Sequence, residues 1–260
     1  MGNFRLLSLL FACISVTSSL SALACFDGHE FSLAPQGGYL RRVKASGSEQ
    51  KAFVYGMGGY YQRWVPNGVF VRAEGYYLEG ELEGENIRNA KVKSDYDEYW
   101  GAAALGWSCE VGSGRPITLA PYVMYGRFYS ENKFTPPTAL LVEMRNRHQV
   151  GGLGLQMRAP LTCSWNLGMD GRVFGMWDAK NKVVDDPTFG TFVQLVDERV
   201  HYYLAFPVSY SFCEEGIDVA FEMTPFYWFR SFGGRENVPV DYDTTRFRQM
   251  GLSAGFTLRL

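Results

Sequence analysis

Four residues of this sequence have the types that amide hydrolysis requires. They are Asp95, Asp97, Asp197 and His201. A histidine beside an aspartate can act as general base for a water molecule, and an Asp–His pair facing two further acids could direct that water at an amide. The two halves of the set lie far apart in the chain, so this chemistry depends on a fold that brings them together. Solvated side chains at a protein surface are the alternative interpretation.

Cysteine and charge give fewer chemical signals. The sequence has five cysteines, and no Cys-x-x-Cys or Cys/His spacing is typical of a zinc site. The formal net charge is −2, which gives no reason to expect a nucleic-acid partner. We therefore expect no bound cofactor, metal or nucleic acid.

The amino terminus has the pattern of a signal peptide. A positive charge at Arg5 precedes the apolar stretch Leu6–Ile14, and small residues lead to Ala24. The apolar stretch is much shorter than the roughly 20 residues that a transmembrane helix needs. We expect a signal peptide over residues 1–24 and one domain over residues 25–260. A lipobox-like reading, in which Cys25 carries a lipid anchor, is the alternative.

Residues 165–178 alternate between an apolar and a mixed polar face. Odd positions include Trp165, Val173 and Trp177, whereas even positions include Asp170 and Arg172. A period of two indicates a β-strand. The same pattern recurs over residues 200–212 and 217–230, and strands of this length exceed the five or six residues usual in globular proteins.

The remaining strands are noisier but readable. They are expected at Phe31–Val43, Ala52–Val65, Val69–Glu79, Tyr96–Val111, Ile117–Tyr129, Arg147–Met157 and Arg246–Leu260. The sum is about ten strands, an even number, as single-chain bacterial barrels show. The expected fold is an all-β, antiparallel, up-and-down transmembrane β-barrel.

Tryptophans on the apolar face suggest where a membrane would lie. Trp165 and Trp177 are twelve residues apart. At about 3.3 Å per residue and a tilt of roughly 45°, that spacing is about 28 Å along the barrel axis. It fits two aromatic girdles around a hydrocarbon band, and Trp107 is expected on the same outward face.

Connection lengths alternate between short and long. Short connections are expected near residues 66–68, 112–116, 159–162 and 213–216, and longer ones near 45–51, 80–95, 130–146, 179–198 and 231–245. Outer-membrane barrels sort periplasmic turns and surface loops in this way. The mature cysteines would all lie toward the periplasm, where they could form disulfides with one another, stay free, or cross-link other envelope proteins: Cys25, Cys109, Cys163 and Cys213.

The carboxyl-terminal segment Ser253–Leu260 resembles the β-signal that the barrel-assembly machinery recognises in bacterial outer-membrane proteins. It has a polar residue, then Gly255, Leu258 and Leu260 at the constrained positions. The resemblance implies a bacterial outer-membrane β-barrel that contacts outer-membrane lipid and, during insertion, that machinery. The acids and His201 also lie roughly where omptin-type surface proteases place their catalytic pairs. Three residues separate Asp197 from His201, however, where the omptin pair has one.

The even, inward face carries charges of both signs. We expect them to form a network of pairs that fills the lumen, because buried charges are costly unless paired. Its members are Arg158, Asp170, Arg172, Asp218, Glu222, Arg230 and Arg259, with Arg72 and Glu74 from a weaker strand. Asp170 and Arg172 on one strand are expected to form a paired network with Asp218, Glu222 and Arg230 on another. The favoured function is a non-enzymatic structural or surface-interaction role. A narrow pore for small solutes and an omptin-like surface protease are the alternatives.

Overall fold

The computed structural model describes residues 28–113, 116–214, 217–234 and 243–260. Within these ranges the regular elements are thirteen β-strands. They are β1 (His29–Lys44), β2 (Glu49–Trp64), β3 (Val69–Glu85), β4 (Lys91–Trp107), β5 (Cys109–Val111), β6 (Ile117–Thr135), β7 (Glu143–Pro160), β8 (Trp165–Asp186), β9 (Gly190–Leu195), β10 (Val200–Ala205), β11 (Val208–Glu214), β12 (Ile217–Phe232) and β13 (Thr245–Arg259). Among the described residues, no helix is long and apolar enough to cross a membrane.

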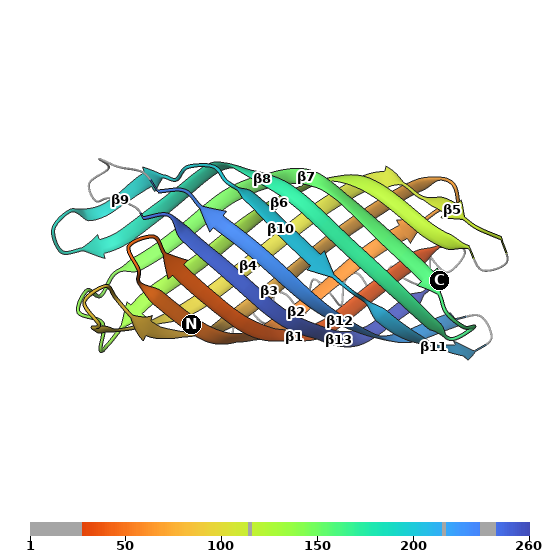
Figure 1. Ribbon diagram of the computed structural model, residues 1–260, viewed down its shortest axis with the longest axis horizontal. Helices are drawn as coiled ribbons and strands as arrows, with labels where there is room; N and C mark the ends of the chain where they lie inside the picture. The colour runs from red at the N-terminus through yellow and green to blue at the C-terminus, as the bar shows by residue number, and fades with distance from the viewer. Residues whose placement is uncertain (1–27, 114–115, 215–216, 235–242) are drawn as a thin grey trace, which may run out of the picture.

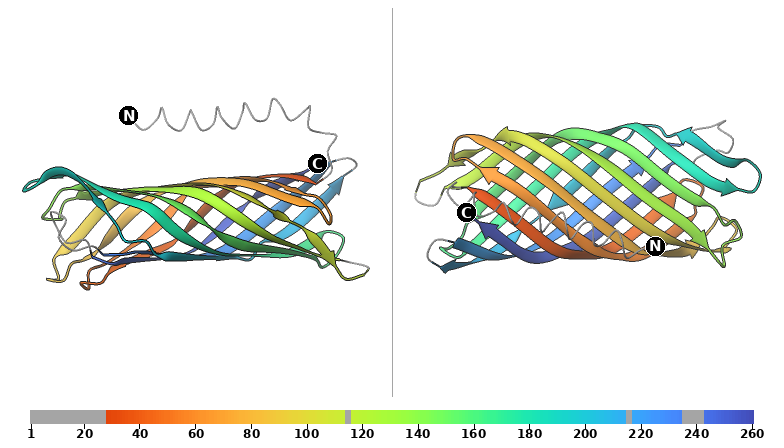
Figure 2. Two further views of the ribbon diagram at one scale, coloured as in Figure 1. Left: turned by 90° about the horizontal axis from the view of Figure 1, so that it is seen from above. Right: turned by 180° about the vertical axis from the view of Figure 1, so that it is seen from behind.

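The strands close into a barrel with ten antiparallel wall strands, as the sequence predicts (Figure 1). The first strand, β1, pairs with the last, β13, and β13 pairs with β12. The ring closes where β10 and β11 lie between β8 and β12. The segments β4 and β5 follow each other in one wall strand, and β9 forms a hairpin with β8. Figure 2 shows the wall strands inclined to the long axis from two further directions.

A proline separates β10 from β11 without breaking the wall. Pro207 has no N–H, so it cannot donate to the ladder. Hydrogen bonds continue on both sides of it: Phe206 donates to the Pro225 carbonyl at 3.0 Å, and Gly168 donates to the Pro207 carbonyl at 2.7 Å. The predicted single strand over residues 200–212 is therefore one wall strand in two segments.

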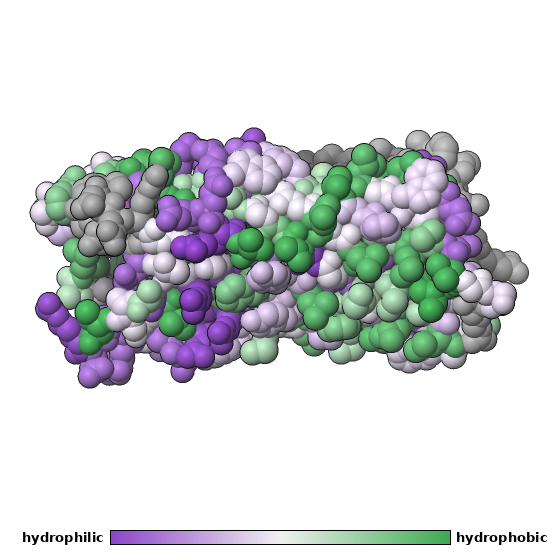
Figure 3. Space-filling model, turned by 45° about the horizontal axis from the view of Figure 1, so that its top comes forward, coloured by the Kyte–Doolittle hydropathy of each residue, from purple (hydrophilic) through white to green (hydrophobic). Residues whose placement is uncertain are grey.

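The two faces of each wall strand differ in polarity as the alternation predicts. In β8, Leu167, Val173 and Trp177 are exposed on the outside, whereas Asp170 and Arg172 are buried inside. Trp107 and Trp165 are also exposed. Figure 3 shows apolar side chains gathered over the half of the barrel away from β9, and hydrophilic ones toward the β9 end. An outward apolar band with flanking aromatics is typical of barrels that span a bilayer.

The connections are shorter than expected at the end of the barrel that carries β9. The loop predicted at residues 80–95 is mostly strand, because β3 extends to Glu85 and β4 starts at Lys91. Likewise β6 and β7 leave only residues 136–142 between them, and β8 continues to Asp186. The prediction was wrong because strands that extend beyond an apolar band carry charges on their outer face, which resembles loop composition.

Candidate functional site

Among the described residues, the ion pairs inside the barrel form three groups, and the first lies toward the end opposite β9. Glu30 of β1 accepts hydrogen bonds from Arg158 of β7, one of them at 2.7 Å, and Arg259 Nε of β13 lies 3.2 Å from the same carboxylate. Arg259 also bonds Asp218 of β12 at 3.2 Å. Gln62 donates to Glu30 as well. This first group contains two guanidiniums and two carboxylates.

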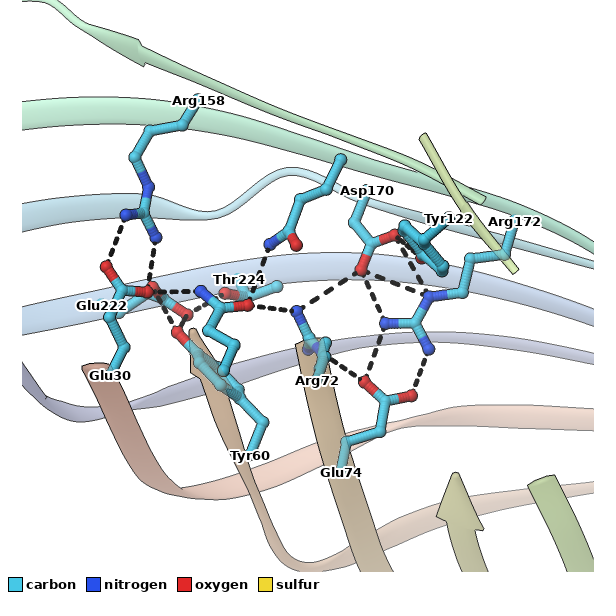
Figure 4. Close-up of polar contacts among 12 residues, drawn as sticks. Glu30, Tyr60, Arg72, Glu74, Tyr122, Arg158, Asp170, Arg172, Glu222 and Thr224 are labelled. Carbon is cyan, nitrogen blue, oxygen red and sulfur yellow. Dashed lines mark hydrogen bonds and ion pairs between the residues drawn. The ribbon is translucent and has the colours of Figure 1, made fainter. Parts of the chain in front are cut away.

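The second group crosses the middle of the lumen (Figure 4). Arg172 of β8 bonds Asp170 at 2.6 Å and Glu74 of β3 at 2.9 Å. Arg72 Nε donates to Glu74 at 2.8 Å, and its Nη1 lies 3.8 Å from Asp170. Tyr122 donates to Asp170 at 2.6 Å. This group also contains two guanidiniums and two carboxylates, which come from opposite walls of the barrel.

The third group is a single ion pair with almost no exposure to solvent. Arg230 of β12 bonds Glu98 of β4, and both side chains are 1% exposed. Tyr76 and Tyr96 also donate to the Glu98 carboxylate. Gln249 accepts a hydrogen bond from Arg230 at 3.2 Å. The Glu98 carboxylate therefore has a charged partner and two hydroxyl donors, which offset its desolvation.

Aromatic rings pack around this third group and continue toward the β9 end. The Arg230 guanidinium lies 4.7 Å from the Trp228 ring centroid and 5.0 Å from that of Phe128. Phe128 stacks on His148 at 4.7 Å, and His148 contacts His201 at 5.5 Å. Further rings belong to Phe174, Phe232 and Phe247. The side chains of this layer are buried.

A cavity of about 130 Å³ lies between the charged groups and the aromatic layer. Charged residues of the first two groups line part of it, and the aromatic residues Tyr203, Phe226 and Trp228 line another part. Glu222 also faces it, and accepts hydrogen bonds from Tyr60 at 3.2 Å and from Thr224 at 3.2 Å. The lining extends to Asn166, the second residue of β8, near the end opposite β9.

The charges predicted for the lumen all lie on inward faces, but they pair differently from what the sequence suggests. The sequence predicts pairing between the charges of β8 and those of β12, which are separated by one wall strand. Arg172, Arg158 and Arg230 instead bond Glu74, Glu30 and Glu98 across the lumen. Two of these acceptors, Glu30 and Glu98, are not among the charges that the sequence predicts for the lumen. Glu30 lies just before the predicted first strand, and Glu98 lies on the inward face of the predicted strand over residues 96–111, so its alternation could have identified it.

The four residues considered for amide hydrolysis are not brought together. Asp97 faces the outside of β4, where it accepts a hydrogen bond from Tyr77 at 2.8 Å, and Asp95 is exposed on the same face. His201 is buried in the aromatic layer and lies 3.2 Å from the Ser231 carbonyl oxygen. Asp197 forms an isolated bridge with Gly233. The barrel wall separates His201 from the two acids.

The described cysteines are free thiols. Cys109 starts β5, and Cys163 is exposed between β7 and β8. A disulfide between these two is therefore not found. Cys25 lies outside the described residues, and so does the side chain of Cys213 in β11. Disulfides that involve Cys25 or Cys213 stay a prediction.

Comparisons with known proteins agree on the fold. No protein-family model matches the chain, and no curated protein matches it significantly. The outer membrane protease OmpT from Escherichia coli has 10% sequence identity and a TM-score of 0.55, with 90% of this chain and 97% of that chain covered. The β domain of the Bordetella autotransporter BrkA has 13% identity and a TM-score of 0.43, with 90% and 100% covered. The chain thus has the barrel fold of OmpT.

Proposed function

We propose that this chain is an integral β-barrel of a bacterial outer membrane, delivered by a cleaved signal peptide and inserted by the barrel-assembly machinery. The outward apolar band, the exposed Trp107, Trp165 and Trp177, and the fold shared with an outer membrane protease support this assignment. The resemblance of Ser253–Leu260 to a β-signal supports the route of insertion.

Within that membrane we propose an anchor rather than an open pore. The observation that carries the proposal is the filling of the lumen: ion pairs join residues up to 132 positions apart across the barrel, and an aromatic layer lies beside them. Barrels of about eight strands have room only for side chains, whereas sixteen leave an aqueous channel. Ten strands filled in this way should not pass ions, and specific function then falls to the two rims.

Planar-bilayer conductance tests the closed lumen. Wild-type protein, with insertion verified by its heat-dependent gel shift, should give no steady conductance, while a sixteen-stranded porin in the same bilayer should. Steady conductance of the wild-type protein would overturn the anchor. It would support the pore if Arg172→Ala altered the ion selectivity and Arg41→Ala, at the strand end, did not.

We include no peptidase activity in the proposal, because His201 and the acids Asp95 and Asp97 face opposite sides of the wall. Cleavage of peptides by the refolded protein, lost in both Asp97→Ala and His201→Ala, would contradict this.

The periplasmic rim offers a contact of its own. The exposed thiol of Cys163 lies in a short connection, where it could form a disulfide with another envelope protein. Non-reducing gels of outer membranes should show a higher-mass species that is absent in Cys163→Ser. An unchanged pattern would remove this contact from the proposal.

A further inference from the structure

Small inward residues line part of the cavity in the barrel. Its wall includes Ala34, Gly58, Gly168, Ala205 and Ser253. Its volume of about 130 Å³ is near that of the engineered cavity of roughly 150 Å³ that holds benzene. The space is therefore comparable to one aromatic ring, and unlike that engineered cavity it has polar groups in its wall.

Glu222 is an inward carboxylate that belongs to none of the three ion-pair groups. The three ion-pair groups contain as many guanidiniums as carboxylates. In the described part of the chain Glu222 has hydroxyl partners, Tyr60 and Thr224, but no cationic side chain within 4.0 Å. Arg72 and Arg158 face it from β3 and β7, and each already bonds a carboxylate of its own group. A buried carboxylate needs a counter-charge or it loses its ionisation.

Aromatic rings form the wall beside this carboxylate. Tyr203 and Phe226 are stacked with ring centroids 6.2 Å apart, and Trp228 meets Tyr203 edge-on at 5.9 Å. Tyr203 and Phe226 are only partly buried although both face inward, so part of each ring borders the cavity. The Arg172 guanidinium already lies 4.6 Å from the Tyr203 ring centroid, and that of Arg230 lies 4.7 Å from the Trp228 centroid, so these rings offer a ligand apolar surface rather than free faces. One carboxylate beside apolar ring surface favours an organic cation, through a charge-assisted hydrogen bond and burial of its apolar part.

We propose that this cavity is a binding site for a small organic cation, an ammonium compound with about one ring of apolar bulk, whose charged group is held by Glu222. The hydroxyls of Tyr60 and Thr224 orient the carboxylate, and the rings of Tyr203, Phe226 and Trp228 cover the apolar part. Because the lining reaches Asn166, the cation enters from the end opposite β9. The site needs no conduction through the barrel, so it is independent of the proposed anchor role.

Three probes with the same ring and different charge test the site by calorimetric titration of the refolded full chain in detergent micelles. Benzylammonium should bind saturably at one site per chain, and benzyl alcohol and benzoate should bind at least tenfold more weakly after subtraction of titrations into empty micelles. Glu222→Gln keeps the shape of the side chain and should weaken benzylammonium binding at least tenfold while leaving benzyl alcohol unchanged. Glu131→Gln removes a carboxylate from the outside of β6 and should change nothing.

A second variant locates the site. Ser253→Leu places apolar bulk in the cavity without removing a charge, and should abolish binding of benzylammonium while the heat-dependent gel shift shows an intact barrel. Equal affinity of wild type and Glu222→Gln for benzylammonium would overturn the proposal. So would the absence of saturable binding to wild type, or benzoate binding as tightly as benzylammonium.

Discussion

The buried pair Arg230–Glu98 should be the most strongly coupled interaction of the barrel. Arg230→Met removes the guanidinium and keeps most of the apolar volume beside Phe128 and Trp228. It leaves Glu98 fully buried with two tyrosine hydroxyls and no cation among its described neighbours. Removing one partner of a buried ion pair typically costs about 3–5 kcal/mol. We expect Arg230→Met to lower the free energy of unfolding by that amount.

The double variant decides whether the loss comes from the isolated charge. In Arg230→Met/Glu98→Gln no buried charge remains, and replacing a buried pair with neutral groups is often nearly neutral. The double variant should therefore recover about 2 kcal/mol or more relative to the sum of the two single variants, which is the coupling energy of the cycle. The surface pair Arg41–Glu49, whose side chains are 41% and 32% exposed, is the control, and should couple by less than about 1 kcal/mol.

Urea-induced unfolding of the barrel in lipid vesicles, followed by tryptophan fluorescence and by the gel shift, measures these free energies. A loss below about 1 kcal/mol in Arg230→Met would refute the strong coupling of this pair. So would single-variant losses that simply add in the double variant. Either result would mean that water reaches the pair.

Three further perturbations can be measured in the same assay. Leu153→Arg places a charge on the most exposed apolar position of β7. It should lower the free energy of unfolding by about 2–4 kcal/mol in lipid but by little in a water-soluble amphipol. Equal losses in lipid and in amphipol would argue against a membrane face at this position. A Cβ at Gly154 would collide with the Tyr122 ring, so Gly154→Ala should cost about 1–3 kcal/mol. Gly101→Ala, with open space around its Cβ, should cost much less, and a similar loss in the two variants would contradict this explanation. Burial and a neighbouring guanidinium lower the pKa of Lys44 from 10.5 to about 8. The unfolded chain then binds more protons between these values, so the free energy of unfolding should rise as pH increases from 8 to 10.5, and Lys44→Met should abolish that rise. A pH profile unchanged by the substitution would exclude Lys44 as its source.

Alternation along single strands allowed the wall of this barrel to be predicted. The segment over residues 165–178 has an apolar face for lipid and a polar face for the lumen, and the structure orients Leu167 and Asp170 accordingly. That signal is local, so it needs no knowledge of neighbouring strands. It weakened where the outer face meets water, because Glu81 and Glu83 on the outside of β3 removed the apolar half of the pattern.

The pairing inside the lumen could not be predicted in the same way. Which guanidinium meets which carboxylate depends on strand register and on the shear of the closed barrel, which set how far opposite walls are offset. Arg172 therefore finds Glu74, which lies 98 positions away, and not the nearer Glu222. The alternation along each strand shows which residues face inward. Their ion-pair partners are determined only when the barrel closes.

This dependence on register also explains why Glu222 has hydroxyl partners but no ion-pair partner among the described residues. Glu222 lies outside the three ion-pair groups, and the cavity that it lines is also lined by the small residues Gly58 and Ser253. For stability alone, an arginine at this place would pair with the carboxylate, and an apolar side chain would fill the space. At Glu222 a carboxylate without an ion-pair partner and an unfilled space lie in one place, beside aromatic rings. A bound organic cation would pair with the carboxylate and fill the space.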